Sequence, residues 1–208
     1  LVYDKQSIRK LFNWDNKKIV VFFLSYLIDN NFPHGHRINF KDSYSWNSFV
    51  LKQIPRLKNV NWIVKDHPRK SKYGYPKKNF REIILNLEKK HKHIKSWPQN
   101  IDNKSLINIT DVALTSSGTV GIEYPAHGIN AVFSEKSLYS NLNFMKIIKS
   151  KKKIIKTMKN IHNIKKPTNR FVEKCKIYSF IFEILIKQKC SLLPNHIVSR
   201  SIDEDEFW

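Results

Sequence analysis

Five short apolar runs are each bounded by charged or turn-forming residues, and segments with helical periodicity lie between most of them. The runs occupy 17–25, 61–67, 93–98, 111–116 and 129–134. The first, KKIVVFFLS, has a continuous apolar centre, which is typical of a strand buried on both faces. The expected intervening helices lie at 43–54, 76–90 and 118–128. This alternation predicts an α/β fold with a Rossmann-like parallel sheet and helices on both faces.

The chain of 208 residues is long enough for one substantial core. We expect a Rossmann-like nucleotide-binding domain at 17–142 and a basic helical extension at 143–208 that packs on the same domain. Within the extension, helical spacing predicts helices at 143–160 and 168–190. Residues 1–16 are too few to form a domain, and we interpret them as a linker or a helix from a missing amino-terminal domain. Because the sequence does not begin with Met, we expect it to be a piece of a longer protein.

The apolar runs and the cysteines suggest a cellular compartment. No run approaches the roughly 20 apolar residues that span a bilayer, and Leu1 does not begin a signal peptide. Cys175 and Cys190 lie 15 residues apart on one expected helix, which disfavours a disulfide between them. We therefore expect two free thiols and a cytoplasmic protein, with peripheral attachment to the inner membrane as a further hypothesis.

The formal net charge of +21 admits several interpretations. Between Lys136 and Val172 there are eleven lysines or arginines and no acidic residue. Such a surface can be simply solvated, or it can attract nucleic acid, an anionic membrane or phosphorylated substrates. The sequence has no zinc-ligand spacing, no aromatic-interleaved strand pair and no arginine-rich recognition helix, so nucleic acid is disfavoured. A solvated face and an anionic membrane surface remain the two interpretations of this stretch.

Polar residues that could bind a ligand follow the fourth apolar run. Ligands of parallel sheets bind beyond the carboxyl ends of the strands, where loops lead into helices. Ser116, Ser117, Gly118 and Thr119 lie at such an end, where backbone N–H groups and hydroxyls can donate to a phosphate and glycine allows close approach. The alternative is an ordinary helix N-cap, for which Ser and Thr are preferred in any case.

Two further residues strengthen the phosphate hypothesis. His67 ends the second run before Pro68, which favours extended backbone, and an imidazole there can donate to a phosphate oxygen. Glu123 lies within the helix after the hydroxyl-rich turn, where its carboxylate can accept from a ribose diol; an ordinary exposed helix acid is the alternative. Asp29 and Arg37, in the first loop, could face the same cleft. No metal-ligand cluster is evident, so we expect no cofactor and no metal.

The segment WIVKDHP, followed by TSSGTVGIEYPAHGI, resembles the carboxyl-terminal half of bacterial GT-B glycosyltransferases that build capsule polysaccharide and lipopolysaccharide. It is most similar to the capsule and Kdo transferases, which use CMP-Kdo, and shares its His-Pro and Ser-Ser motifs with sialyltransferases, which use CMP-sialic acid. The resemblance covers roughly residues 17–135. It implies that His67, Ser116 and Ser117 contact the CMP phosphate. It further implies that Thr119 assists them and that Glu123 binds the ribose.

The same resemblance implies a nucleotide-sugar donor and a glycan or lipid-linked acceptor. Transferases of this kind carry acid/base and acceptor-side carboxylates in an amino-terminal domain, so we expect those groups outside this chain and expect the chain alone to be inactive. Three alternatives remain open. They are a CDP-glycerol glycerophosphotransferase of the teichoic-acid type, a UDP-sugar 2-epimerase, and a non-catalytic module that binds a nucleotide or a membrane.

Overall fold

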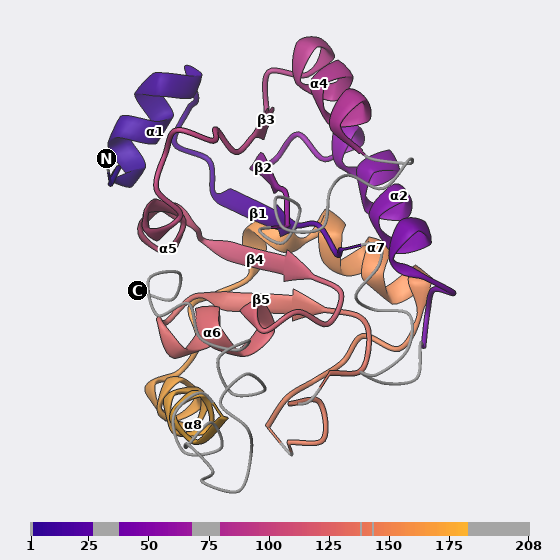
Figure 1. The fold of residues 1–208 in the computed structure, drawn as a ribbon, viewed down its shortest axis with the longest axis vertical. Helices are drawn as coiled ribbons and strands as arrows, with labels where there is room; N and C mark the ends of the chain where they lie inside the picture. The colour runs from indigo at the N-terminus through magenta and orange to yellow at the C-terminus, as the bar shows by residue number, and fades with distance from the viewer. Residues whose placement is uncertain (1, 27–37, 68–79, 138, 143, 183–208) are drawn as a thin grey trace, which may run out of the picture.

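A parallel five-stranded sheet forms the centre of the protein (Figure 1). The computed structural model describes residues 2–26, 38–67, 80–137, 139–142 and 144–182. The strands are β1 Ile19–Phe23, β2 Asn61–Lys65, β3 Ile94–Ser96, β4 Val112–Thr115 and β5 Asn130–Phe133. They pair in the order β3-β2-β1-β4-β5, and every pairing is parallel. The predicted α/β class and the five predicted strands are confirmed.

Helices cover both faces of the sheet. They are α1 Lys5–Phe12, α2 Ser43–Gln53, α4 Arg81–Lys90, α5 Lys104–Ile109, α6 Val120–Ala126, α7 Lys151–Lys159 and α8 Asn169–Phe180. Short 3₁₀ turns follow α2 and α7, at Ile54–Arg56 and Ile161–Asn163. In Figure 1, α6 lies in front of the sheet and α7 lies behind it. The sequence did not predict α5, which is only 6 residues long.

The central strand β1 explains the continuous apolar run. Val20 and Phe22 pack with α2, α4 and α7, whereas Ile19 and Val21 pack with α1, α5 and α6. All four side chains are fully buried. Alternate residues of a strand point to opposite faces, so a strand covered by helices on both sides needs apolar residues at every position.

The expected helix at 143–160 is wrong in its first half. Residues 144–150 are not helical, and α7 begins only after Ser150, whose side chain accepts the Lys153 N–H at 3.2 Å. The reason is packing: Phe144 contacts the cluster formed by Phe133, Tyr139 and other residues beside α6 and α8, whereas Ile148 contacts the core on the α2 side. One helix could not reach both places. The expected helix at 76–90 begins, within the described residues, at Arg81; 76–79 lie outside them.

Helix α7 separates an apolar stripe from a lysine face, as the spacing predicted. Ile154 and Met158 are fully buried, and the lysines are exposed at 151–153, 156 and 159. Among the described residues, no ion pair involves these lysines. None of the helices in the described ranges has the length and apolarity needed to cross a bilayer. Docking of this face on an anionic membrane stays a prediction.

Helix α1 packs on the same core as the sheet. Ile8 is fully buried beside Ile19. The Lys5 ammonium lies 2.8 Å from an Asp111 carboxylate oxygen at the start of β4, and the Tyr3 N–H donates to Ser105 Oγ at 2.8 Å. Residues 3–12 are therefore part of this folded unit.

Replacing Ile8 with Ala should lower the free energy of unfolding by about 2–5 kcal/mol, because the truncation leaves a cavity in a packed core. The control Leu11→Ala lies on the same helix, but Leu11 is 53% exposed, so its effect should stay within about 0.5 kcal/mol. Urea denaturation followed by circular dichroism measures both. Equal, small effects would show that α1 does not belong to the cooperative unit.

Candidate functional site

The carboxyl ends of β2, β1 and β4 lie side by side and carry the predicted residues. His67 follows β2, and its ring stacks on Tyr26, which follows β1, with 5.4 Å between the ring centroids. On the other side, Ser25 after β1 and Ser116 after β4 place their hydroxyl oxygens 2.6 Å apart. The strand order reverses direction between β1 and β4, which is where doubly wound sheets bind ligands. The structure thus brings His67 and the serine turn to opposite flanks of one strand end.

Ser116 holds neighbouring strand ends together through its hydrogen bonds, and the phosphate contact expected for its hydroxyl stays a prediction. It is fully buried, and its hydroxyl is paired with that of Ser25. Its carbonyl accepts the N–H groups of Ser134 and Glu135, at 3.1 and 3.0 Å. These bonds join the ends of β1, β4 and β5.

Asn47, which holds Ser25 in place, was not among the residues predicted from the sequence. Asn47 on α2 accepts the Ser25 N–H at 3.1 Å and donates its amide to the Ser25 carbonyl at 2.9 Å. Both residues are buried. The sequence signal for this contact was a single amide, Asn47, next to Trp46 on the expected apolar face of α2. A polar side chain buried there requires hydrogen-bond partners.

Beyond Ser116 the turn reaches the surface. Ser117 and Gly118 are half-buried, and Thr119 is exposed. Thr119 occupies the N-cap position of α6 but makes no side-chain capping bond. Within the described part of the chain, the N–H groups of Thr119 and Val120 have no hydrogen-bond acceptor. The Thr119 hydroxyl therefore does not act as an ordinary helix N-cap. The N–H groups of Thr119 and Val120 remain available as donors on this turn.

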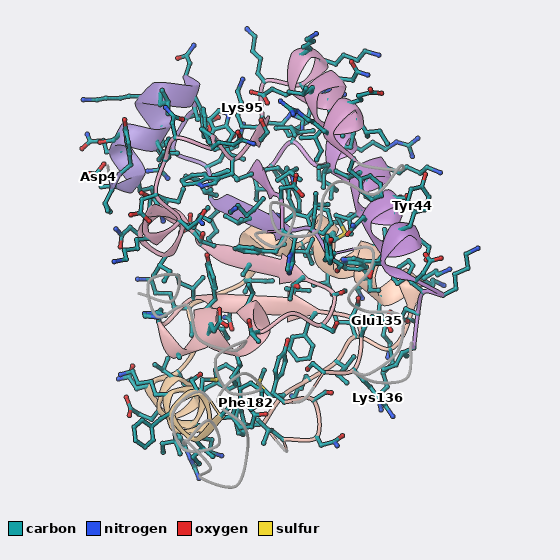
Figure 2. All side chains as sticks on the ribbon, in the orientation of Figure 1. Asp4, Tyr44, Lys95, Glu135, Lys136 and Phe182 are labelled. Carbon is teal, nitrogen blue, oxygen red and sulfur yellow. The ribbon has the colours of Figure 1, made fainter. Side chains whose placement is uncertain are left out.

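A buried carboxylate closes the end of β5. Glu135 is 1% exposed and accepts the N–H groups of Ile38 and Asn39, at 2.5 and 3.1 Å. The Asn39 amide donates to the carbonyls of Ser134 and Ile148, at 2.6 and 2.7 Å. Figure 2 places Glu135 beside the carboxyl end of the sheet. An acid directly after the last apolar run was the sequence signal for this residue, and it was missed.

Glu123 lies half-buried on α6, beyond the turn. Burial, with a smaller contribution from the Glu123 carboxylate, raises the pKa of Tyr124 and of Tyr139 above the usual range. Contact with a ribose stays a prediction for this residue. Asp29 and Arg37 lie outside the described residues.

The structure describes one of the two cysteines. Cys175 is buried, and burial raises the pKa of its thiol to about 12, so this thiol stays protonated and unreactive at neutral pH. Cys190 lies outside the described residues.

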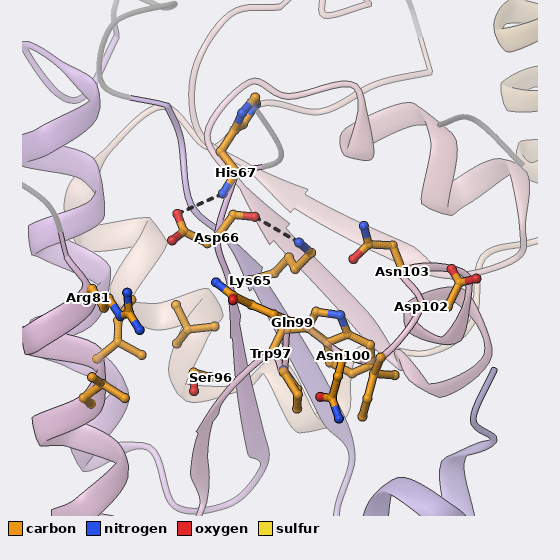
Figure 3. Close-up of a pocket in the computed structure, with 15 residues that line it drawn as sticks. Lys65, Asp66, His67, Arg81, Ser96, Trp97, Gln99, Asn100, Asp102 and Asn103 are labelled. Atoms are coloured by element: carbon orange, nitrogen blue, oxygen red, sulfur yellow. Dashed lines mark hydrogen bonds between the residues drawn. The ribbon is translucent and has the colours of Figure 1, made fainter. Parts of the chain in front are cut away.

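A cavity of about 730 Å³ opens at the carboxyl ends of β2 and β3 (Figure 3). Arg81 of α4 lies on one side of it, and Asp102 lies on the other, near the start of α5. Between them are the amide side chains of Gln99, Asn100 and Asn103. Of the predicted residues only His67 borders this cavity, so the serine turn lies outside it. The sequence did not predict this space, because its walls come from separate elements.

No group of three or more His, Cys, Asp or Glu side chains in the described ranges is placed to hold a metal ion. The cavity lining carries charges of both signs, with Lys65 and Arg81 as cations and Asp66 and Asp102 as anions. Such a lining favours a ligand with both donors and acceptors rather than a bare ion.

Comparison with known proteins gives structural similarities only. No protein-family model matches the chain, and no curated protein matches it significantly. The wall teichoic acid polymerase TagF superposes with a TM-score of 0.49 at 14% identity, covering 84% of this chain and 39% of TagF. The UDP-GlcNAc 2-epimerase from Neisseria meningitidis, bound to UDP-GlcNAc, superposes with a TM-score of 0.46 at 14% identity, covering 88% of this chain and 48% of the epimerase.

The chain thus spans less than half the length of either solved protein. TM-scores below 0.5 at such low identity do not carry an activity from one protein to another.

The structure separates the two neighbouring serines by role. Ser116→Ala should lower the free energy of unfolding by about 1–3 kcal/mol, because it leaves the buried Ser25 hydroxyl without this partner. Ser117→Ala, at the half-buried next position, should change it by less than about 0.5 kcal/mol. Chemical denaturation of both variants measures the difference. A Ser116→Ala variant as stable as the wild type would remove the holding role.

Proposed function

We propose that this chain is the donor-binding domain of a GT-B glycosyltransferase, and that its donor is a CMP-activated acid sugar of the Kdo or sialic acid type. The observation that carries the proposal is the convergence of His67 and the serine turn on opposite flanks of the β1 end. The motif resemblance supplies the choice of CMP.

In this proposal the donor phosphate lies between the two flanks. Ser117, Gly118 and Thr119 offer hydroxyls and backbone N–H groups from one side, and the His67 imidazole donates from the other. Ser116 supports the turn from below through its bonds to Ser25 and to the end of β5. Transfer breaks the bond between the anomeric carbon and the phosphate oxygen, so negative charge develops on the departing CMP. Donors aimed at that phosphate stabilise the charge.

The rest of the nucleotide needs a base site and a ribose site. The cavity beyond His67 provides space, and the amides of Gln99, Asn100 and Asn103 can both donate to and accept from the edge of a base. Glu123 is assigned to the ribose hydroxyls. The acceptor would be a hydroxyl of a growing capsule or lipopolysaccharide glycan. The group that deprotonates it is assigned to a domain outside these residues, so the 208-residue chain should bind donor without turnover.

Nucleotide choice is the first test. CMP should stabilise the chain, by about 2.7 kcal/mol at a hundred times its dissociation constant, whereas UMP and UDP should not. Thermal denaturation with CMP, CDP-glycerol, UDP-GlcNAc and UMP in parallel measures this. Stabilisation by CDP-glycerol alone would favour a glycerophosphotransferase, and stabilisation by UDP-GlcNAc alone would favour an epimerase-like site. Stabilisation by none of them would overturn the nucleotide site.

The phosphate assignment is the second test. His67→Ala and Ser117→Ala should each weaken CMP binding by about 1.5–3 kcal/mol, the range for hydrogen bonds to a charged group, without loss of the fold. The matched controls are His127→Ala, an exposed histidine after α6, and Ser48→Ala, a half-buried serine on α2, neither of them assigned to the phosphate. Isothermal titration calorimetry compares the four. Wild-type affinity in both site variants would show that the phosphate lies elsewhere.

A further inference from the structure

Tyr139 reaches the serine turn from the side opposite to Ser25. Its hydroxyl donates to the Gly118 carbonyl at 2.6 Å, and the side chain is only 2% exposed. The ring packs edge-to-face on Phe133, with 5.3 Å between centroids, in a cluster with Ile122 and Met145. A hydroxyl held by such packing defines the position of its acceptor.

A glycine in α6 makes room for this bond. A Cβ atom on Gly121 would lie 2.0 Å from the Tyr139 hydroxyl oxygen and 2.7 Å from the ring carbon that bears it. Any side chain at 121 would therefore displace Tyr139 from the turn. Glycine inside a helix costs about 0.5–1 kcal/mol relative to alanine, and the approach of Tyr139 is a physical reason for its presence here.

The bond also sets the direction of a neighbouring donor. The Gly118 carbonyl and the Thr119 N–H belong to one peptide group, and in a trans peptide these two groups point in opposite directions. The Gly118 carbonyl is held inward by Tyr139 and by the Gly121 N–H at 2.9 Å. The Thr119 N–H consequently points away from Tyr139, and it has no acceptor among the residues that the structure describes.

We infer that Tyr139 is a positioning residue of the nucleotide site: its hydroxyl orients the Gly118–Thr119 peptide so that the Thr119 N–H faces the phosphate of a bound nucleotide. The identity of the ligand, a nucleotide phosphate, rests on the proposed function. The orientation of the peptide rests on the geometry alone. It adds a residue outside the turn, 20 positions beyond Thr119 in the sequence.

The protonation state of Tyr139 suits this role. Burial raises the pKa of its phenol above the ordinary value, so the hydroxyl keeps its proton and remains a donor through the neutral range. A deprotonated phenol would repel the Gly118 carbonyl. The contribution of Tyr139 should therefore not change between about pH 6 and 8, below the ordinary phenol pKa of about 10.

Tyr139→Phe tests the inference, because it removes the hydroxyl and keeps the ring. The matched control is Tyr178→Phe, a tyrosine that packs against the same cluster without a hydroxyl bond to the turn. CMP affinity should fall about two- to tenfold in Tyr139→Phe, the effect of one neutral hydrogen bond, and should not fall in the control. Binding of cytidine, which has no phosphate, should be equal in both variants and the wild type. Calorimetry measures these affinities.

A second measurement needs no nucleotide. The Thr119 amide resonance in a nitrogen–proton correlation spectrum should shift in Tyr139→Phe and stay in place in Tyr178→Phe. An unmoved Thr119 resonance would overturn the orienting role. A moved resonance with unchanged CMP affinity would overturn the link to phosphate binding. A wild-type chain that binds no nucleotide would overturn the proposed function and that link together, while the Thr119 resonance would still decide whether Tyr139 orients the peptide.

Discussion

The hydrogen bonds of Ser116 hold the carboxyl edge of the sheet together. Its hydroxyl meets Ser25 after β1, and its carbonyl receives two N–H groups after β5. The ladder bonds of a parallel sheet stop where the strands stop, so the polar groups just beyond need other partners if they are buried. Ser116, after β4, supplies these partners for the groups that follow the two adjacent strands, β1 and β5. The position of the turn that follows Ser116 depends on these hydrogen bonds.

The turn after Ser116 combines a rigid base with exposed donors. Ser25 and Glu135 secure the base from the β1 and β5 sides, and Tyr139 secures the Gly118 carbonyl. Ser117 and Thr119 lie above this base and reach the surface. Residues that hold the turn should therefore affect stability or peptide orientation, and residues that it presents should affect binding. Under the proposed function, the turn would accept a phosphate with little reorganisation, because its base is already fixed by these hydrogen bonds.

Part of the large positive charge lies on the exposed lysines of α7. The lysines of α7 surround a buried stripe at Ile154 and Met158, so apolar packing anchors this helix to the core. A net charge of +21 attracts anions of every kind and raises their local concentration. Selection among those anions requires directed donors, and the proposed function assigns this task to the serine turn and His67 at the carboxyl edge of the sheet.

The sequence by itself determined the strands and the class of fold, because continuous apolar runs such as 17–25 report burial on both faces through local pattern alone. It also located His67 and the turn from Ser116 to Thr119, because polar residues after a buried strand must lie at its carboxyl end. Tertiary structure decided which strand ends are neighbours, and hence that Ser116 is buried while Ser117 is presented. The partners Ser25 and Ser116 are 91 positions apart. Tyr139 was missed for the same reason. Its role depends on a hydrogen bond to the Gly118 carbonyl, 21 positions away, and local periodicity does not predict such a contact.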